Sequence, residues 1–328
     1  MTYEEAKSAF ERLFEHGMSN DEMRSFLVSM KLDEQTRVET IAAAAAVMRS
    51  YAVALPVNEG LRPKMIDVVG TGGDKSGSFN ISTTTSILLA SCGAYVAKHG
   101  NRSITSKSGS ADVLEALGVR LDLSLENTAK MLEETGFAFM FAQNHHPAMK
   151  FIMPVRKSIS EKTVFNVLGP LTNPAGAEKF LLGVFDRAFV PKLAEALRLN
   201  GAKSAIVVSA AEGMDEISIS GITYAASLKE GIINEYEIDP QEFGIKYAPF
   251  EAILGGDAKQ NAVILRNVLE NRAERPQRDI VLINTAAALQ ADGMARDIQE
   301  GLEIAGDSIL SGKAADKLQQ IIKISSAL

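Results

Sequence analysis

Apolar residues near the start of the chain recur at the spacing of an α-helix. One set lies between Phe10 and Phe14 and a second between Met23 and Met30. Each set follows a capping-box sequence, Thr2 to Glu5 and Ser19 to Glu22, in which the hydroxyl and the later glutamate satisfy free backbone N–H groups. A third helix is predicted from residue 36 through the alanine run. The first 64 residues are therefore expected to be helical.

From residue 65 the pattern changes to short apolar strands that alternate with helices. Helices are predicted over 110–117 and 124–135, each followed by a glycine that suits the left-handed cap. The candidate strands are Ile66–Val69, Tyr95–Ala97, Phe137–Phe141, Phe180–Phe185, Ser204–Val208 and Ile280–Ile283. This alternation predicts an α/β fold with a mostly parallel central sheet covered by helices. Residues 294–328 are expected to be helical again, with a break near 311–312.

Composition indicates a folded protein with a large core. The chain has 328 residues, 46% of them apolar and 23% charged, a balance that argues against disorder. The formal net charge of −7 argues against a nucleic-acid partner, although a local phosphate site remains compatible with it.

Compartment signals favour the cytoplasm. Cys92 is the single cysteine, so no intrachain disulfide can form, and the N-terminus lacks a signal-peptide pattern. The most apolar segment, Ile41–Met48, is too short to span a bilayer. We expect a cytoplasmic protein that does not enter the membrane.

A glycine-rich segment, 70–74, directly follows the first predicted strand. Glycines at such a position allow the backbone to approach a phosphate closely. A Walker A loop would need glycine where Asp74 precedes Lys75, and a dinucleotide fingerprint would need glycine at Lys75 itself. A phosphate loop of another kind and a tight turn without a ligand both remain open.

Two further strand-end segments carry anion-binding chemistry. Residues 80–84 place hydroxyls before an apolar helix, where they either cap the helix or donate to an anion. Residues 98–110 combine cations and hydroxyls after the second strand, as in a solvated loop or a phosphate clamp. Because ligands of such sheets bind beyond the carboxyl ends of strands, the combination of three segments favours phosphate binding.

An acidic pair and an arginine are less informative by themselves. Asp215 and Glu216 follow the strand at 204–208 and suit Mg²⁺ shared with substrate phosphates, but from the pair alone an exposed acidic turn is the favoured explanation. Arg156 has the side chain that holds a carboxylate through two parallel hydrogen bonds. Adjacent His145 and His146, with one cysteine in the chain, do not make a zinc cluster.

Taken together, these segments resemble the anthranilate phosphoribosyltransferase family. That family transfers the phosphoribosyl group of phosphoribosyl pyrophosphate (PRPP) to the amine of anthranilate, a step of tryptophan biosynthesis. The matching segments, in order, are GTGGD (70–74), NIST (80–83), KHGNRS (98–103), SGSAD (108–112), HHPAMK (145–150), FNVLGPLTNPAG (165–176) and MDEIS (214–218).

The resemblance implies a domain organisation and an assembly. Residues 1–64, joined by helices from about 158–172, would form a small all-helical domain. Residues 65–328 would form the larger α/β domain that binds PRPP. A homodimer would form through the helical domain, and PRPP and anthranilate would be the substrates. The reaction would be Mg²⁺-dependent, release pyrophosphate and invert the configuration at ribose C1.

The resemblance also implies roles for individual residues. Lys98, His99 and Arg156 would act in catalysis. Two Mg²⁺ ions would be held by Ser82, Asp215 and Glu216 together with the pyrophosphate. Anthranilate would contact Gly70, His99, Asn101, Arg156 and Pro170. The residues implied to bind PRPP are Gly70, Gly73, Asp74, Ser78, Asn80, Ile81, Ser82, Thr83, Lys98, Asn101, Arg102, Ser103, Ser106 and Ser110.

One segment departs from the family pattern, and two other functions compete with it. Where the family carries Gly-x-Arg-Thr, this chain has Ser-Glu-Lys-Thr at residues 160–163. The change puts local packing or substrate entry in question rather than the reaction.

A pyrimidine-nucleoside phosphorylase resembles the family in fold but needs neither the acidic pair at 215–216 nor Arg156. A catalytically silent phosphosugar-binding module is disfavoured by the intact GTGGD and KHGN segments.

Overall fold

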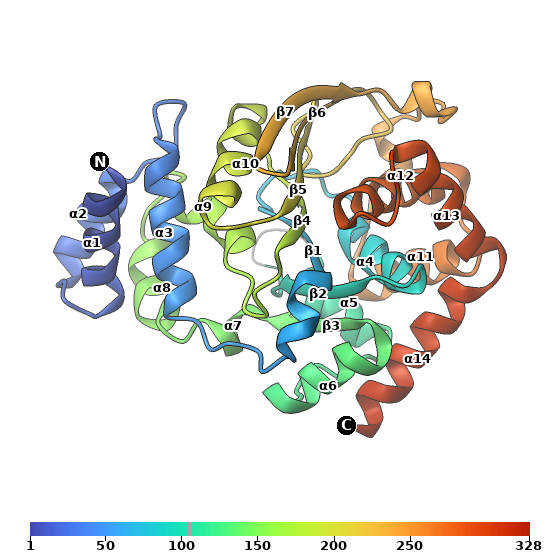
Figure 1. Cartoon of the computed structure of the whole chain (residues 1–328), viewed down its shortest axis with the longest axis horizontal. Coiled ribbons are helices and arrows are strands. Elements are labelled where there is room, and N and C mark those ends of the chain that lie inside the picture. The colour runs from blue at the N-terminus through green and yellow to red at the C-terminus, as the bar shows by residue number, and fades with distance from the viewer. Residues whose placement is uncertain (104–106) are drawn as a thin grey trace.

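A computed structural model describes residues 1–103 and 107–328 and has a central sheet between layers of helices (Figure 1). The sheet has seven strands in the order β3-β2-β1-β4-β5-β6-β7. The first five pair in parallel, whereas β6 pairs antiparallel with both β5 and β7, so the prediction of a mostly parallel sheet is confirmed. The strands are β1 (Met65–Gly70), β2 (Tyr95–Gly100), β3 (Phe137–Phe141), β4 (Lys179–Gly183), β5 (Ser204–Ala210), β6 (Thr223–Lys229) and β7 (Ile232–Ile238).

Helices precede, connect and follow the strands. The α-helices are α1 (Tyr3–Phe14), α2 (Asn20–Ser29), α3 (Val38–Ser50), α4 (Ile81–Ser91), α5 (Ser110–Ala116), α6 (Leu125–Thr135), α7 (Ala142–His145), α8 (Met149–Lys157), α9 (Phe165–Leu168), α10 (Val190–Leu199), α11 (Ala258–Leu269), α12 (Arg275–Asp292), α13 (Ile298–Leu310) and α14 (Lys313–Ala327). Short 3₁₀ helices are η1 (Glu59–Lys64), η2 (Gly169–Leu171), η3 (Arg187–Phe189), η4 (Pro240–Phe243) and η5 (Phe250–Ile253). No described helix has the length and apolar character of a membrane span.

One strand prediction is wrong. The segment Ile280–Ile283 lies inside α12, where Ile280, Val281 and Ile283 are 0% exposed. This helix is buried between the sheet and α13, so its apolar positions form a continuous run instead of one stripe. A short continuous apolar run does not distinguish a buried strand from a buried helix, which explains the error.

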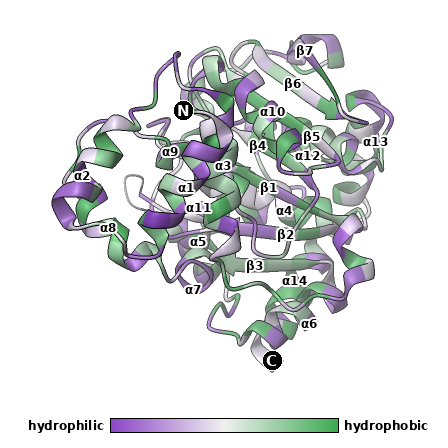
Figure 2. Cartoon of the chain, turned by 60° about the vertical axis from the view of Figure 1, so that its left-hand side comes forward, coloured by the Kyte–Doolittle hydropathy of each residue, from purple (hydrophilic) through white to green (hydrophobic). Residues whose placement is uncertain are grey.

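The two antiparallel strands were not predicted. Most residues of β7 are exposed or half-buried, because this strand forms the edge of the sheet. Its sequence, Ile-Ile-Asn-Glu-Tyr-Glu-Ile, therefore lacks the apolar run that marks the central strands. Figure 2 colours the chain by hydropathy and shows β6 and β7 at one edge of the sheet.

The sheet separates two apolar clusters, and successive strand residues alternate between them. In β5, Ile206 and Val208 belong to the cluster that contains residues of α4 and α12, whereas Ala205 and Val207 belong to the cluster that contains residues of α10 and the N-terminal helices. Figure 1 shows α1–α3 on one side of the sheet and α12–α14 on the other. Because the N-terminal helices share a cluster with one sheet face, a domain division after residue 64 stays a prediction.

The segment that departs from the family pattern lies where the N-terminal helices meet the rest of the chain. Lys162 O accepts a hydrogen bond from Leu32 N–H at 2.9 Å, and Val164 N–H donates to Met30 O at 2.9 Å. The Lys162 ammonium lies 3.2 Å from the centroid of the Phe185 ring, just beyond β4. Lys162 therefore has a packing contact at this junction, in line with an effect of the departure on local packing.

Both predicted capping boxes are present. The Ser19 hydroxyl accepts from Glu22 N–H at 3.3 Å, and the Glu22 carboxylate accepts from Ser19 N–H at 2.9 Å. Thr2 and Glu5 do the same at α1. The third helix begins at Val38, two residues later than predicted, with Arg37 as its N-cap and no side-chain hydrogen bond at the cap.

Replacing Ser19 with alanine is expected to lower the free energy of unfolding by about 1 kcal/mol, because the N–H of Glu22 loses its acceptor. Urea denaturation followed by far-UV circular dichroism measures the change. The matched control is Ser25→Ala, at an exposed position inside the same helix, which should leave stability unchanged or slightly higher. Equal losses in both variants would contradict the capping role.

Candidate active site

Four segments far apart in the sequence meet at the carboxyl ends of the parallel strands. Gly72 N–H, in the glycine turn after β1, donates to Asp215 Oδ2 at 2.7 Å. Ser82 N–H, in the first turn of α4, donates to Glu216 Oε1 at 3.1 Å. Lys98 Nζ, in β2, donates to Val68 O at 2.6 Å and lies 3.4 Å from Ser82 Oγ. The glycine turn, the hydroxyl-rich helix start, the lysine and the acidic pair are thus brought together.

Two glycines make room for the acidic pair. A Cβ atom on Gly183, the last residue of β4, would lie 1.6 Å from the backbone oxygen of Asp215. A Cβ atom on Gly70 would lie 2.3 Å from Asp215 Oδ2. Only glycine fits at these two strand ends. Gly183 was missed in the sequence, although a glycine that closes an apolar strand is a signal of close backbone approach.

The acidic side chains of this edge are held where ionisation is disfavoured. Burial raises the pKa of the half-buried Asp215 carboxyl, and the charge of Asp74 raises it further. Burial raises the pKa of Glu216 well above its ordinary value, with Asp215 adding to the effect. One oxygen of Asp74, Oδ2, has no hydrogen-bond partner among residues 1–103 and 107–328. A bound cation would stabilise this accumulation of carboxylates.

Lys98 is the buried cation of the edge. Its side chain is 1% exposed. Burial lowers the pKa of its ammonium group, whereas the charges of Asp67 and Glu216 oppose that shift. The ammonium is fixed by a carbonyl oxygen, so its charge is presented at a defined place beside the acidic pair.

The donor set fits a hard divalent ion that is shared with a ligand. Ser82, Asp215 and Glu216 offer only oxygen atoms, which Mg²⁺ prefers. Within the described residues, no three side chains of histidine, cysteine, aspartate or glutamate lie close enough to hold a metal by themselves. Mg²⁺ is commonly bound by one or two carboxylates together with substrate phosphates, and these residues match that arrangement.

A second region is built around His99, the residue that follows Lys98 in β2. The His99 ring faces Gly169 O, 3.2 Å from Nδ1, so Nδ1 carries the proton and donates. Burial, and after it the nearby His146 with ring centroids 5.2 Å apart, lowers the pKa of His99 to about 3. His99 is therefore neutral at pH 7. Pro170, buried in η2, follows the carbonyl that His99 contacts.

Arg156 projects from α8 and lacks an acidic partner in the described part of the chain. Its Nη2 donates to Phe165 O at 3.3 Å, and its guanidinium carbon lies 5.6 Å from the centroid of the Phe165 ring. Burial lowers the pKa of the guanidinium. Most of its N–H donors remain available for a carboxylate that enters from outside.

The other predicted phosphate-binding residues lie along the same edge, but several side chains are already engaged. The Arg102 guanidinium pairs with Asp112 at 3.0 Å and Glu115 at 2.6 Å. Ile81 and Thr83 are 1% and 0% exposed, which leaves only their backbone for a ligand. Ser106 lies outside the described residues.

The remaining polar residues of this group are held by local hydrogen bonds. Asn80 Oδ1 accepts from Asn261 Nδ2 at 2.9 Å, and Ser78 Oγ lies 3.2 Å from Ser76 Oγ. Asn101 Oδ1 accepts from Arg102 N–H at 2.8 Å. Ser103 N–H donates to Asp112 Oδ2 at 3.1 Å, and Ser110 begins α5. The segments are thus ordered around the glycine turn, with Gly73 exposed and in the left-handed region at φ 75°.

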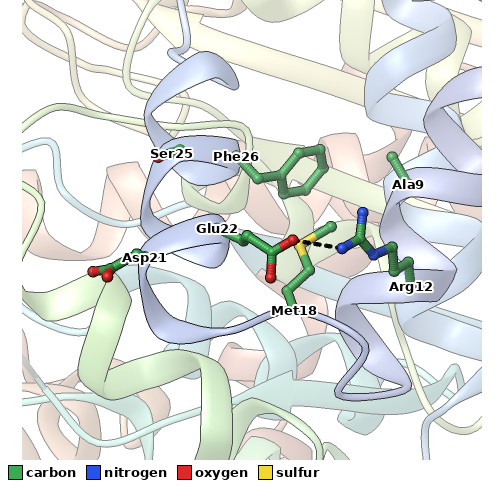
Figure 3. A pocket seen from close by; sticks show the side chains of 7 residues that line it. All are labelled: Ala9, Arg12, Met18, Asp21, Glu22, Ser25 and Phe26. Carbon is green, nitrogen blue, oxygen red and sulfur yellow. Dashed lines mark hydrogen bonds and ion pairs between the residues drawn. The ribbon is translucent and has the colours of Figure 1, made fainter.

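A pocket of about 520 Å³ lies elsewhere, between α1 and α2 (Figure 3). Arg12 Nη2 and Glu22 Oε1 form an ion pair at 2.7 Å in its wall. None of the predicted substrate residues lines it. The residues that do are Ala9, Arg12, Met18, Asp21, Glu22, Ser25 and Phe26.

Sequence comparison finds relatives along the whole chain. A family model described as "Glycosyl transferase family, a/b domain" matches residues 62–315. The anthranilate phosphoribosyltransferase of Rhodopseudomonas palustris (strain TIE-1) is 45% identical over 327 residues, covering 100% of this chain and 95% of the relative. That of Xanthobacter autotrophicus (strain ATCC BAA-1158 / Py2) is 44% identical, covering 100% and 94%.

Solved structures with the same fold carry the same name. Anthranilate phosphoribosyltransferase from Thermus thermophilus superposes with a TM-score of 0.91 at 38% identity, covering 99% of this chain and 96% of that one. The enzyme from Saccharomyces cerevisiae, in complex with PRPP and Mg, gives a TM-score of 0.85 at 29% identity, covering 94% and 86%. A complex of the yeast enzyme with 4-fluoroanthranilate gives 0.88 at 26% identity, covering 100% and 94%.

Proposed function

This chain belongs to the anthranilate phosphoribosyltransferase family, and from that premise we propose that it transfers the phosphoribosyl group of PRPP to the amine of anthranilate. The products would be N-(5-phosphoribosyl)anthranilate and pyrophosphate. The observation that carries the proposal is the meeting of the glycine turn, Lys98 and the Asp215–Glu216 pair at one sheet edge. The PRPP- and Mg-bound form of the yeast relative supports the same substrate.

We assign the phosphate side of the site to the segments that follow β1 and β2. Backbone N–H groups of the glycine turn and the first turn of α4 are suited to pyrophosphate oxygens. Lys98 adds a fixed positive charge beside them. Asp74 has one unpartnered oxygen among the described residues, which is available to PRPP hydroxyls or to a metal-bound ligand. Ser78, Asn80, Ser103, Ser106 and Ser110 are assigned here too, with backbone contacts from Ile81, Thr83 and Arg102.

We assign Mg²⁺ to Ser82, Asp215 and Glu216, and we propose two ions, the number that the family resemblance implies. When bound, Mg²⁺ would neutralise the charge that develops on the leaving pyrophosphate. The protein's part is to hold its carboxylates at the strand ends, where Gly72 N–H and Ser82 N–H orient one oxygen of each. Gly70 and Gly183 allow the acidic pair to reach that place.

We assign the anthranilate side to Gly70, His99, Asn101, Arg156 and Pro170. Arg156 can bind the substrate carboxylate through two parallel hydrogen bonds. Neutral His99 has an Nε2 lone pair that can accept from the aromatic amine and orient it. An arylamine is unprotonated at neutral pH, so orientation rather than a strong base would carry much of the catalysis. Attack from the face opposite pyrophosphate would invert the configuration at ribose C1.

The function is tested by mixing the purified protein with PRPP, Mg²⁺ and anthranilate and following the loss of anthranilate fluorescence. Loss that needs both PRPP and Mg²⁺, and that stops with EDTA, is the expected result. A nucleoside phosphorylase would instead cleave a pyrimidine nucleoside with inorganic phosphate. Cleavage in that second assay, without any loss of anthranilate in the first, would overturn the proposal.

Gly73→Val should weaken PRPP binding about fivefold to thirtyfold, because a β-branched residue at positive φ costs about 1–2 kcal/mol and would distort the turn. Isothermal titration with PRPP and Mg²⁺ measures the change. Gly201→Val is the matched control, since Gly201 also has positive φ and open space around its Cβ position but precedes β5, at the opposite end of the strand. Equal PRPP affinity in wild type and folded Gly73→Val would show that the turn does not bind the ligand.

We further propose that residues 1–64, with helices from about 158–172, act as a small domain through which two copies associate. Contacts between α3 and α9 join these two parts of the chain. Sedimentation equilibrium at micromolar concentration should give twice the chain mass of 35.2 kDa. A single species at the chain mass would reject the homodimer without affecting the chemistry.

A further inference from the structure

Asp67 is a buried carboxylate outside the residues assigned to either substrate. It lies in the middle of β1 and is 0% exposed. Its Oδ1 accepts from the backbone N–H of His99 at 3.1 Å, and its Oδ2 accepts from Asn173 Nδ2 at 2.7 Å. A buried ionised group is costly unless it is fully hydrogen-bonded, so these two contacts hold their partners in place.

The amide of Asn173 is oriented by its own contacts. Its Nδ2 also donates to Ala97 O in β2 at 2.8 Å. Its Oδ1 accepts from Ala175 N–H at 3.0 Å. Turning the amide over would place Oδ1 of Asn173 against the oxygens of Asp67 and Ala97, and Nδ2 against the N–H of Ala175. The Asp67 carboxylate therefore faces two donors, Nδ2 of Asn173 and the backbone N–H of His99. Hydrogen bonds from such donors to a carboxylate are stronger than neutral ones and specific in geometry.

The three segments joined by Asp67 carry four of the five residues assigned to anthranilate, the exception being Arg156 in α8. β1 ends at Gly70, three residues after Asp67. β2 contributes His99, whose backbone Asp67 holds. Asn173 follows Gly169 and Pro170 in the loop after α9, and the His99 ring bonds to Gly169 O. The phosphate side depends instead on contacts between the glycine turn, α4 and the acidic pair.

We propose that Asp67 is a positioning residue for anthranilate: with Asn173 it fixes His99 and the Gly169–Pro170 loop relative to the end of β1. This inference rests on the proposed function. Asp67 does not touch the reacting atoms and acts through the backbone of His99 and the amide of Asn173.

The test compares Asp67→Asn with wild type in steady-state kinetics, with anthranilate and PRPP each varied in turn. The asparagine has the same size and keeps one acceptor for His99 N–H, but its amide meets the amide of Asn173. We expect kcat/KM for anthranilate to fall about tenfold to hundredfold, because a charge-assisted contact is replaced by a mismatch. The KM for PRPP should change by less than the anthranilate effect: the variant removes a charge that supports the Lys98 ammonium, but the hydrogen bonds of the glycine turn, α4, Lys98 and the acidic pair remain.

The matched control is Asp292→Asn. Asp292 is also a buried acid bonded to a strand, at 3.0 Å from Lys179 Nζ, but Lys179 begins β4 at the opposite end of the sheet. This variant should lower thermal stability and leave both kinetic constants unchanged. A fall in anthranilate kcat/KM of the same size in both variants would reduce Asp67 to a general stabilising role and overturn the inference.

Asn173→Ser provides a second test at the other end of the contact, and it decides the matter if Asp67→Asn does not fold. It should also raise the anthranilate KM. The loss in kcat/KM for anthranilate in the double variant should be smaller than the product of the losses in the two single variants. Independent, multiplicative effects, or equal losses for both substrates, would overturn the inference. Turnover by wild type under the same conditions tests the proposed function separately. An inactive wild type would reject the function itself, whereas an active wild type with unaffected variants would reject the role of Asp67 alone.

Discussion

Asp215→Asn should lower kcat/KM about a thousandfold while the protein remains folded. A metal ion at such a site contributes several kcal/mol of charge stabilisation, and each 1.4 kcal/mol corresponds to a factor of about ten. The asparagine keeps an oxygen that can accept from Gly72 N–H, so the turn after β1 should stay in place. The loss would then report the missing charge rather than a collapsed loop.

The measurement is initial rate against Mg²⁺ concentration, with circular dichroism as the check on folding. Asp186→Asn is the matched control, because Asp186 is an exposed acid just beyond β4 that caps η3, and asparagine caps equally well. That variant should keep wild-type rates. If Asp215→Asn retained more than a tenth of the activity with an unchanged Mg²⁺ requirement, the metal assignment would be wrong.

Arg156→Ala should lower kcat/KM for anthranilate about tenfold to hundredfold with little change in PRPP affinity. A charge-assisted contact to a carboxylate is worth about 1.5–3 kcal/mol, and PRPP is held by other residues. The loss appears mainly in KM if the contact acts equally in ground and transition states, whereas kcat falls too if Arg156 orients the amine. Arg156→Lys should restore only part of the loss, because a point charge does not reproduce the planar fork.

Kinetics with each substrate varied in turn separate the two sides of the site. Lys157→Ala is the matched control, since Lys157 is the next residue of α8 and is exposed. It should leave both substrates unaffected. An Arg156→Ala variant that lost PRPP affinity but kept its anthranilate KM would place this arginine on the phosphate side.

The site elements were predictable from the sequence because the relevant signals are local and the topology is repetitive. Glycines after β1, hydroxyls before α4 and the lysine of β2 each stand at the end of a strand. In a parallel sheet the carboxyl ends of strands share one edge, so separate strand-end segments are expected to meet there. Family resemblance supplied what these signals lacked, namely the roles of Arg156 and of the acidic pair.

The sequence by itself determined the capped N-terminal helices, the central parallel strands and the chemistry offered at their ends, because caps and periodicity depend on neighbours within a few residues. Only the tertiary structure decided that Ile280–Ile283 is helical, since burial on all sides erased the helical stripe. It alone showed that Gly183 makes room for Asp215 and that Asp67 bonds to Asn173, 106 residues away. Such contacts join segments that are far apart in the sequence, and the periodicity within one segment does not indicate which distant segment it will meet. Only the packing of the fold brings them together.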